Sequence, residues 1–251
     1  MTVDNSSLIP PFEDLPSWLC SRCQKSTLAL DSKPLVKEPK WSRDAREHSA
    51  WELEWIIERF VSTMICSNLD CGEIYFVSGY RTHCYTQISW DDAEHEISHW
   101  PEAITPGVSL FRIPDECPKL VKKELKRAFK LYWPDEEACA NRLRVAVEEL
   151  LTHQKIPKTV TIKGKRSILY LHSRIDKFRV KNKEAADLLM AIKWLGNNSS
   201  HASRDKLNRK EVLEGFELIE HVIELLYVKK SQKLKSLAKK ITARKGKPKK
   251  K

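Results

Sequence analysis

The residues best suited to chemistry in this 251-residue chain are four cysteines in two short-spaced pairs. Two residues separate Cys20 from Cys23, four separate Cys66 from Cys71, and 42 residues lie between the pairs. A short loop lets two thiolates converge from one turn, and two such turns supply the four soft ligands of a tetrahedral Zn²⁺ site. The spacing therefore predicts a metal site with zinc as its cofactor. Because four protein ligands leave no position for water, we expect its role to be structural.

The surroundings of the second pair indicate a zinc-ribbon-like module. Gly72 follows Cys71 directly and precedes an apolar run, as in the second metal-binding turn of a zinc ribbon. Since the interval between the pairs is long for a minimal ribbon, we expect an inserted helix over 49–64. Its predicted apolar positions are Trp51, Trp55, Ile56 and Phe60. Two alternatives stay open: His83 or Cys84 replaces one ligand, or the four cysteines are ordinary small core residues.

The cysteine count and the ends of the chain bear on the compartment. Seven cysteines are an odd number, and residues 1–16 lack the basic and then apolar pattern of a signal peptide. No segment approaches the roughly 18 uninterrupted apolar residues that a membrane helix needs. We therefore expect a cytoplasmic protein without a disulfide framework or membrane contact.

The positive charge of the chain is concentrated at one end. The chain carries 45 Lys and Arg against 34 Asp and Glu, a net charge of +11, whereas residues 229–251 alone carry +12. The remaining 228 residues thus sum to −1. Lysines without interleaved aromatic residues favour contact with the phosphate backbone of RNA or DNA, without base reading. The alternatives are a solubilising terminus and a weak contact with an anionic membrane.

The composition and the apolar patterns predict an α+β protein with two domains and a tail. We expect strands over 73–79 and 85–90 in the first domain, and a proline-rich linker at about 101–118. The predicted domains are a zinc-ribbon-like module with the inserted helix at 1–104, a mainly α-helical bundle at 105–228 and a basic tail at 229–251. The tail should begin as a continuation of the last helix and then fray.

Four helices are expected in the second domain. Apolar stripes predict helices over 118–132, 135–153 and 183–195 and one that opens at Asn208, whose side chain can cap it while Glu211 reaches back. Gly196 would end the third helix. The segment 156–179 stays open between a strand near 159–162 and a helix near 168–178.

Two polar motifs stand out among these stripes. Arg144 and Glu148 lie four apart on a helix face shared with apolar residues, which is an unusual place for charge. The second motif is a predicted helix end followed by a polar turn whose last residue is a histidine, Gly196-Asn197-Asn198-Ser199-Ser200-His201. Ile113-Pro114 and Arg174-Ile175 are two further motifs. Because the four motifs occur in this order and at this spacing, residues 111–227 resemble the bacterial family catalogued as domain of unknown function 4145. That family resembles a branch of the HEPN superfamily, and a cysteine-pair module precedes the domain in many members.

The resemblance carries expectations about function. Active HEPN ribonucleases use a histidine and an arginine, usually across a helical dimer, so that a ribose 2′-hydroxyl attacks the adjacent phosphate without a metal. In this chain His201 would move the proton, Asn197 would orient the phosphate or the imidazole, and Arg144 would support the site. Lys193 occupies the position where many relatives carry arginine, and lysine lacks the planar fork of guanidinium.

Three hypotheses about function follow. The first is a homodimeric nucleic-acid-associated protein of a bacterial defence or restriction-type system, with a possible partner protein from that system. The second is a metal-independent endoribonuclease, and the third a protein-binding adaptor without catalysis. Equally open is a structural role for the motif residues, with Arg144 and Glu148 as an ion pair, Gly196 as a helix stop and His201 as a satisfied turn residue.

The remaining histidines and glycines suggest little. His95 and His99 are four apart and could form a metal pair on a helix, but Pro101 follows closely, and we interpret the stretch as solvated and polar. The sequence has no glycine-rich phosphate loop and no Gly-x-Ser-x-Gly motif. ATP hydrolysis and serine-esterase chemistry are therefore not expected.

Overall fold

The computed structural model describes residues 5–89, 92–162, 164–198, 207–243 and 245. The chain divides into two compact units. The sheet unit comprises Met1–Arg112 and Lys126–Cys139, and the helical unit comprises Ile113–Leu125 and Ala140–Lys251. Two of the three boundaries, after Leu125 and after Cys139, fall inside helices, so that each of these helices contributes residues to both units.

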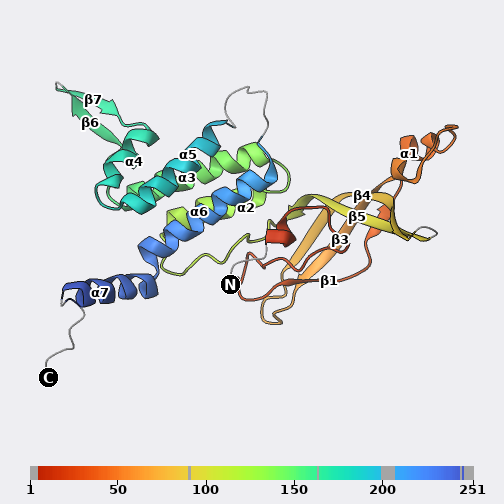
Figure 1. Ribbon diagram of the computed structural model, residues 1–251, viewed down its shortest axis with the longest axis horizontal. Helices are drawn as coiled ribbons and strands as arrows, with labels where there is room; N and C mark the ends of the chain where they lie inside the picture. Colours follow the sequence, from red (N-terminus) through yellow and green to blue (C-terminus); the bar gives the residue numbers. More distant parts are fainter. Residues whose placement is uncertain (1–4, 90–91, 163, 199–206, 244, 246–251) are drawn as a thin grey trace. The chain divides into compact units, whose positions relative to one another are not determined.

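The sheet unit is built on a five-stranded antiparallel sheet. In chain order its strands are β1 (Leu28–Leu30), β2 (Leu35–Lys37), β3 (Ile57–Cys66), β4 (Ile74–Ser89) and β5 (Asp92–Thr105). The spatial order is β1-β3-β4-β5, and β2 pairs with the other half of β3. β4 and β5 form a long curved hairpin (Figure 1). Central β3 therefore connects the two short strands to the hairpin.

The helix expected over 49–64 is wrong. Apart from a short 3-10 helix (Leu53–Trp55), this stretch becomes β3, on which Phe60, Ser62, Met64 and Cys66 are buried in strict alternation. A period of two places these residues on one sheet face, and pairing on both sides of β3 outweighs the weak helical spacing of the tryptophans. The helix that does lie between the cysteine pairs is the short α1 (Lys40–Ala45).

The hairpin also differs from expectation. The strands predicted over 73–79 and 85–90 belong to one strand, β4, which bends at a bulge between Ser78 and Gly79. A Cβ at Gly79 would lie 2.1 Å from the carbonyl oxygen of Trp100, so only glycine permits this approach. β5 contains Pro101, which places the start of the expected linker within the sheet.

The interpretation of the stretch around His95 and His99 as solvated is wrong for His99. β5 places both residues on a strand, so the alternative of a metal pair on a helix does not apply either. His99 is also buried rather than solvated, and it hydrogen-bonds the backbone oxygen of Glu13 through Nδ1 at 2.8 Å. Both residues thus lie on a paired strand, with the ring of His99 buried and that of His95 exposed.

Aromatic residues fill the core of the sheet unit. Trp18 contacts Trp133 edge-on at 5.4 Å between ring centroids, and Phe12 packs against both. The Tyr132 hydroxyl donates to the backbone oxygen of Leu8 at 2.9 Å, which satisfies a polar group in this apolar setting. Trp133 and Tyr132 follow α2 (Lys119–Leu131), so the end of this helix belongs to the core of the sheet unit.

The expected helices of the second domain are confirmed. They are α2, α3 (Glu136–His153), α5 (Lys183–Asn198) and α6 (Arg209–Tyr227). The segment 156–179, for which the sequence allows a strand or a helix, contains both. A hairpin of β6 (Thr159–Ile162) and β7 (Lys165–Ile168) comes first, and α4 (Leu171–Arg179) follows it. In the helical unit α5 packs against α4 and α6 (Figure 1).

Helix ends are partly as expected. At the start of α6, Asn208 and Glu211 form the reciprocal capping box. The expectation that Gly196 ends a helix is wrong, because α5 continues to Asn198. The tail is not a continuation of α6 either: Val228 is extended, and α7 (Lys229–Ala243) is a separate helix.

Candidate functional site

The four cysteines of the two short-spaced pairs converge on one point in the sheet unit. Their sulfur atoms all lie within 4.8 Å of one another, and Cys20 and Cys66 are buried whereas Cys23 and Cys71 are half-buried. The closest contacts join the pairs crosswise, at 3.8 Å between the Cys20 and Cys71 sulfurs and 3.7 Å between those of Cys23 and Cys66. These four thiols are therefore positioned as one ligand set.

The backbone brings each pair together through a left-handed residue. Gln24 follows the first pair at φ 52°, and Gly72 follows the second at φ 53°. These turns are closed by hydrogen bonds from the Gln24 N–H to the Cys20 oxygen and from the Gly72 N–H to the Asn68 oxygen, both at 3.0 Å. Glycine adopts this conformation without strain, which explains Gly72 directly after the last cysteine.

Strand pairing brings the two turns side by side. β1 pairs with the end of β3 so that Leu28 lies opposite Cys66, and the second turn connects β3 to β4. The first pair immediately precedes β1 in the chain, and the N–H of Cys20 donates to the oxygen of Ser26 at 3.0 Å. A separation of 42 residues is thereby closed by one short sheet contact.

Hydrogen-bond donors surround the sulfurs. The Lys25 N–H donates to the Cys23 sulfur at 3.5 Å, and the fully buried Tyr75 hydroxyl donates to the Cys20 sulfur at 3.4 Å. The same hydroxyl accepts the N–H of Ser21 at 2.8 Å, which fixes its direction. Donors aimed at sulfur stabilise thiolate over thiol, as metal ligation requires. Tyr75 and Lys25 were not predicted, because nothing in the sequence shows that β4 returns beside the first turn.

The acidities of the thiols diverge strongly. Burial opposes ionisation of Cys23, but the backbone N–H groups of Lys25 and Ser26 prevail and lower its pKa to about 6. Burial raises the pKa of Cys66 to about 12. Four thiolates at these distances cannot ionise together without a compensating cation, because like charges repel in a partly buried site. A divalent ion supplies that compensation.

The geometry fits a tetrahedral metal ion. A metal–sulfur bond of about 2.3 Å in a tetrahedron requires sulfur–sulfur distances of about 3.8 Å, which the two crosswise contacts match. A disulfide needs about 2.05 Å. Within the residues that the structure describes, this is the only group of three or more possible metal ligands that converge so closely. His83 and Cys84 are not part of it, so the alternative ligand sets do not apply to this cluster.

A polar cavity of about 220 Å³ lies beside the first cysteine turn. Ser21 and Arg22, the two residues between Cys20 and Cys23, line it together with Lys126 and Lys130 from the exposed side of α2. Glu73 contributes the only carboxylate to the lining and pairs with Arg22 at 2.7 Å. Three cations thus face this cavity against one anion.

Of the four residues that the family resemblance implies in catalysis, the structure describes three. His201 lies outside the described residues, and Asn197 is in α5. Lys193 is buried, with its ammonium 3.3 Å from the centroid of the Trp194 ring. Arg144 approaches Glu148 to 3.9 Å and is half-buried. Among the described members of the set, Lys193 and Arg144 therefore each contact a neighbouring residue of their own helix.

Two of the motif residues have a packing role in the helical unit. A Cβ at Gly196 would lie 3.1 Å from Arg144 Cβ and 3.2 Å from the Ala140 oxygen, so glycine allows α5 to approach α3 closely. Buried Arg174 donates to the Thr152 hydroxyl at 2.9 Å and to the Ile156 oxygen, which ties α4 to the end of α3. Burial lowers the pKa of this guanidinium.

Comparison with known families agrees with the two-part organisation. Residues 126–244 match the model of a family described as domain of unknown function (DUF4145), and residues 12–108 match that of a second, described as domain of unknown function (DUF8608). The first match supports the resemblance drawn from the polar motifs. Neither the curated proteins nor the solved structures contain a match. None of the helices in the described residues has the length and apolar character needed to cross a membrane.

Proposed function

We propose that this protein binds nucleic acid through its basic tail and carries a structural Zn²⁺ at Cys20, Cys23, Cys66 and Cys71. Zinc is the metal that four thiolates in a tetrahedron favour, and a site closed by four protein ligands serves folding rather than catalysis. When bound, the ion would hold the turn before β1 against the turn between β3 and β4. In this respect the cluster is similar to a zinc ribbon.

The charge distribution is the observation on which nucleic-acid binding rests. Residues 229–251 carry +12, and the rest of the chain carries −1. Part of this segment is α7, in which Leu234, Leu237 and Ile241 are all exposed. A lysine-rich segment without aromatic residues neutralises phosphates and releases their counterions, so binding should be independent of sequence and should weaken steeply with salt.

The cavity beside the cysteine turn provides secondary support. Arg22, Lys126 and Lys130 face it, and a phosphate oxygen could be held there by cations on a rigid scaffold. The same cations offset the charge of −2 that Zn²⁺ with four thiolates carries. We expect the tail to provide most of the affinity and this cavity a smaller part.

The experiment is a titration of labelled single-stranded RNA, single-stranded DNA and duplex DNA, followed by fluorescence anisotropy. The test variant replaces the eleven tail lysines with glutamine, and the matched control replaces them with arginine, which keeps the charge. We expect the glutamine variant to lose at least about tenfold in affinity, and the arginine variant to bind like wild type with the same linear dependence of log K on log salt.

Two results would overturn the proposal. Equal affinity of the glutamine variant would show that the tail does not contact phosphate, and absence of wild-type binding at low salt would leave the protein-binding adaptor as the better hypothesis. Incubation of the same RNAs with EDTA also addresses the ribonuclease hypothesis. We propose binding without turnover because Lys193 is buried against Trp194; cleavage that disappears in His201→Ala would instead favour the enzyme.

We further propose that the protein is a homodimer that acts in a bacterial defence or restriction setting together with a partner protein of that system. The match of residues 126–244 to DUF4145 supports this part, through the resemblance drawn from the sequence motifs. Light scattering coupled to size-exclusion chromatography measures the oligomeric state, and a monomer at micromolar concentration would contradict it.

A further inference from the structure

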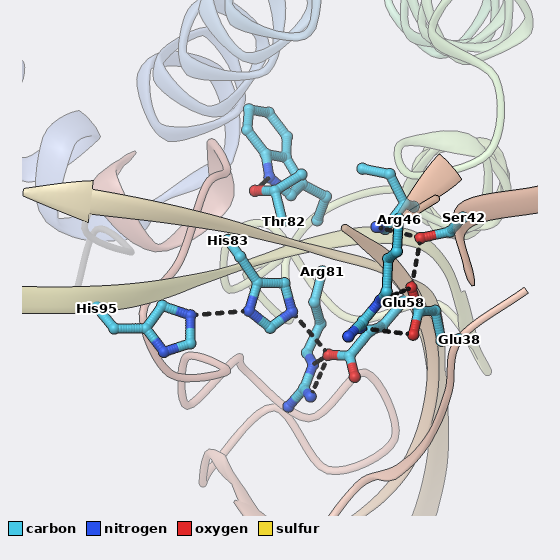
Figure 2. Close-up of polar contacts among 10 residues, drawn as sticks. Glu38, Ser42, Arg46, Glu58, Arg81, Thr82, His83 and His95 are labelled. Atoms are coloured by element: carbon cyan, nitrogen blue, oxygen red, sulfur yellow. Dashed lines mark hydrogen bonds and ion pairs between the residues drawn. The ribbon is translucent and has the colours of Figure 1, made fainter. Parts of the chain in front are cut away.

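A second cluster of titratable residues lies on β3, β4 and β5, apart from the cysteine set. Figure 2 shows it as a chain of contacts from Arg81 through Glu58 and His83 to His95. Arg81 donates to Glu58 Oε2, and His83 Nε2 lies 2.9 Å from the same oxygen. On the other side of its ring, His83 Nδ1 lies 2.9 Å from His95 Nε2. The arrangement orients two imidazole nitrogens toward each other.

Glu58 fixes the tautomer of His83. Arg81 donates two hydrogen bonds to Glu58 Oε2, from Nε at 3.1 Å and from Nη2 at 2.5 Å, so this residue is a carboxylate. A carboxylate can only accept hydrogen bonds, so Nε2 of His83 carries the hydrogen and donates it to Glu58, and Nδ1 presents a lone pair toward His95. A histidine that donates one ring N–H to a carboxylate and presents the other nitrogen is the usual arrangement of a metal ligand.

The distance between the rings fits a shared metal ion. Two nitrogens bound at about 2.0–2.1 Å in a tetrahedron lie about 3.3 Å apart, close to the 2.9 Å observed between His83 Nδ1 and His95 Nε2. The rings are nearly parallel, with 20° between their planes and 5.1 Å between their centroids. A small outward rotation of the exposed His95 ring would open the required space.

We propose that His83 and His95 bind a second divalent transition-metal ion, with Zn²⁺ as the physiological candidate and Glu58 orienting His83 from behind. The rings extend from paired antiparallel strands, since Tyr85 lies opposite His95 and Ile97 opposite His83, and this scaffold keeps them in place. Buried His83 and exposed His95 place the ion at the edge of the sheet unit rather than within its core.

The surroundings favour a cation and leave coordination positions open. A cavity of about 400 Å³ adjoins His95, and carboxylates line it. The charged lining residues are Glu13, Asp14, Glu94, Glu96 and Arg81. Since Glu58 offsets Arg81, the net field of this cavity is negative. Among described residues no third side-chain ligand converges with the two histidines as closely as the cysteines do. Water and a cavity carboxylate or a ligand oxygen would complete the shell, unlike in the closed cysteine site.

The test counts metal ions and identifies their ligands. Purified full-length protein is equilibrated with Zn²⁺ and analysed for metal per chain, and in parallel it is titrated with Co²⁺ as a spectroscopic probe. Thiolate ligation gives sulfur-to-cobalt charge-transfer absorption, whereas histidine and oxygen ligation gives only ligand-field bands. We expect two metal ions per wild-type chain, the second Co²⁺ adding ligand-field absorption without further charge transfer.

The variants separate this site from the cysteine cluster. His95→Ala removes an exposed ring, so the fold should persist, and we expect one metal per chain with the charge-transfer bands unchanged. Glu58→Gln should weaken the second site about 10-fold to 100-fold while leaving both ligands in place. The matched control is His48→Ala, an exposed histidine of the same unit, which should keep two ions. A single ion in wild type that shows charge-transfer absorption, or two ions in His95→Ala, would show that the rings share only a hydrogen bond.

Discussion

The sheet unit and the helical unit hold their polar residues in different ways. In the sheet unit, strand pairing brings side chains from distant segments together, so that cysteines 42 residues apart share one point. In the helical unit the singled-out residues lie within packing contacts, with Gly196 against Arg144 and Arg174 against the end of α3. The first arrangement creates ligand sets, whereas the second fixes how helices cross.

Because of this difference, a sequence motif in the helical unit does not by itself indicate a functional site. The residues that carry the resemblance to DUF4145 are explained in part by helix packing, and their spacing alone does not indicate chemistry. Packing alone does not require cysteine at these positions, since an apolar residue of similar volume would fill a core nearly as well. Convergent sulfurs with donors aimed at them therefore carry more functional weight than the helical motifs.

The largest effect is expected from loss of the cysteine site. Cys66→Ser should abolish the cooperative unfolding transition of the sheet unit, because a structural zinc site contributes on the order of 10 kcal/mol in small domains. Tryptophan fluorescence measures this, since Trp18 and Trp133 are buried in that unit. Cys84→Ser, half-buried and outside the cluster, is the control and should melt like wild type. Equal melting of both variants would show that the four thiols hold no structural ion.

Glu220 gives the helical unit a pH dependence that the sheet unit should not share. Burial, followed by repulsion from Glu224, raises its pKa from 4.5 to about 7. A raised carboxyl pKa means that the folded state binds the proton more tightly, so this stability is complete below pH 4.5 and is lost as the pH rises through 7. After allowance for partial exposure, Glu220→Gln should stabilise the unit by about 1–2 kcal/mol above pH 7 and by nothing at acidic pH.

Urea unfolding followed by the helical circular-dichroism signal, repeated across that pH range, measures the effect. Glu214→Gln is the matched control, because this exposed glutamate lies on the same helix. A stabilisation of Glu220→Gln that does not vary with pH would contradict the assignment.

How far the sequence predicts the structure also differs between the units. The helices of the helical unit follow from local signals, namely apolar stripes and the Asn208–Glu211 box, which act within a few residues. The tight spacing within each cysteine pair is likewise local, so the sequence predicts the four residues of the cluster that could hold a metal ion. The alternation of β3 was missed because buried Ser62 and Cys66 interrupt its apolar pattern, and the tryptophans before it suggest a helical spacing.

Contacts that depend on register could not be predicted. Glu58, His83 and His95 meet only because β3 pairs with β4 and β4 with β5 in one particular alignment. A shift of one residue would turn each side chain to the opposite face. The sequence places these residues on separate segments without fixing that alignment, so it shows the spacing of His95 and His99 along the chain but not the contact of His95 with His83 across the sheet.

A smaller effect should follow from the close approach of α5 to α3. Gly196→Ala places a methyl group against Arg144 Cβ and a backbone oxygen, whereas Gly215→Ala meets only the ends of the Leu143 and Leu195 side chains. Both changes gain helix propensity, but only the second site can relax by rotating side chains. We expect Gly196→Ala to be less stable than Gly215→Ala by about 1 kcal/mol in urea unfolding. Equal stabilities would mean that α5 can move away from α3 at little cost.

The smallest expected effect on stability is that of removing the Arg144–Glu148 ion pair. Its size tests whether this pair is more than a surface interaction. The charged atoms lie 3.9 Å apart on a half-exposed helix face, so the pair should contribute only about 0.3–0.5 kcal/mol. Glu148→Gln keeps the shape of the side chain and removes the charge, and Glu214→Gln, at an exposed glutamate on α6 of the same unit, serves as the control. If Glu148→Gln lowers the free energy of unfolding in urea by more than about 2 kcal/mol, the pair is instead desolvated, because only a buried ion pair loses that much when one partner is removed. Gly196 allows α5 to approach Arg144 closely. Such a result would therefore make the point where α5 crosses α3 a candidate functional site and not only a packing contact.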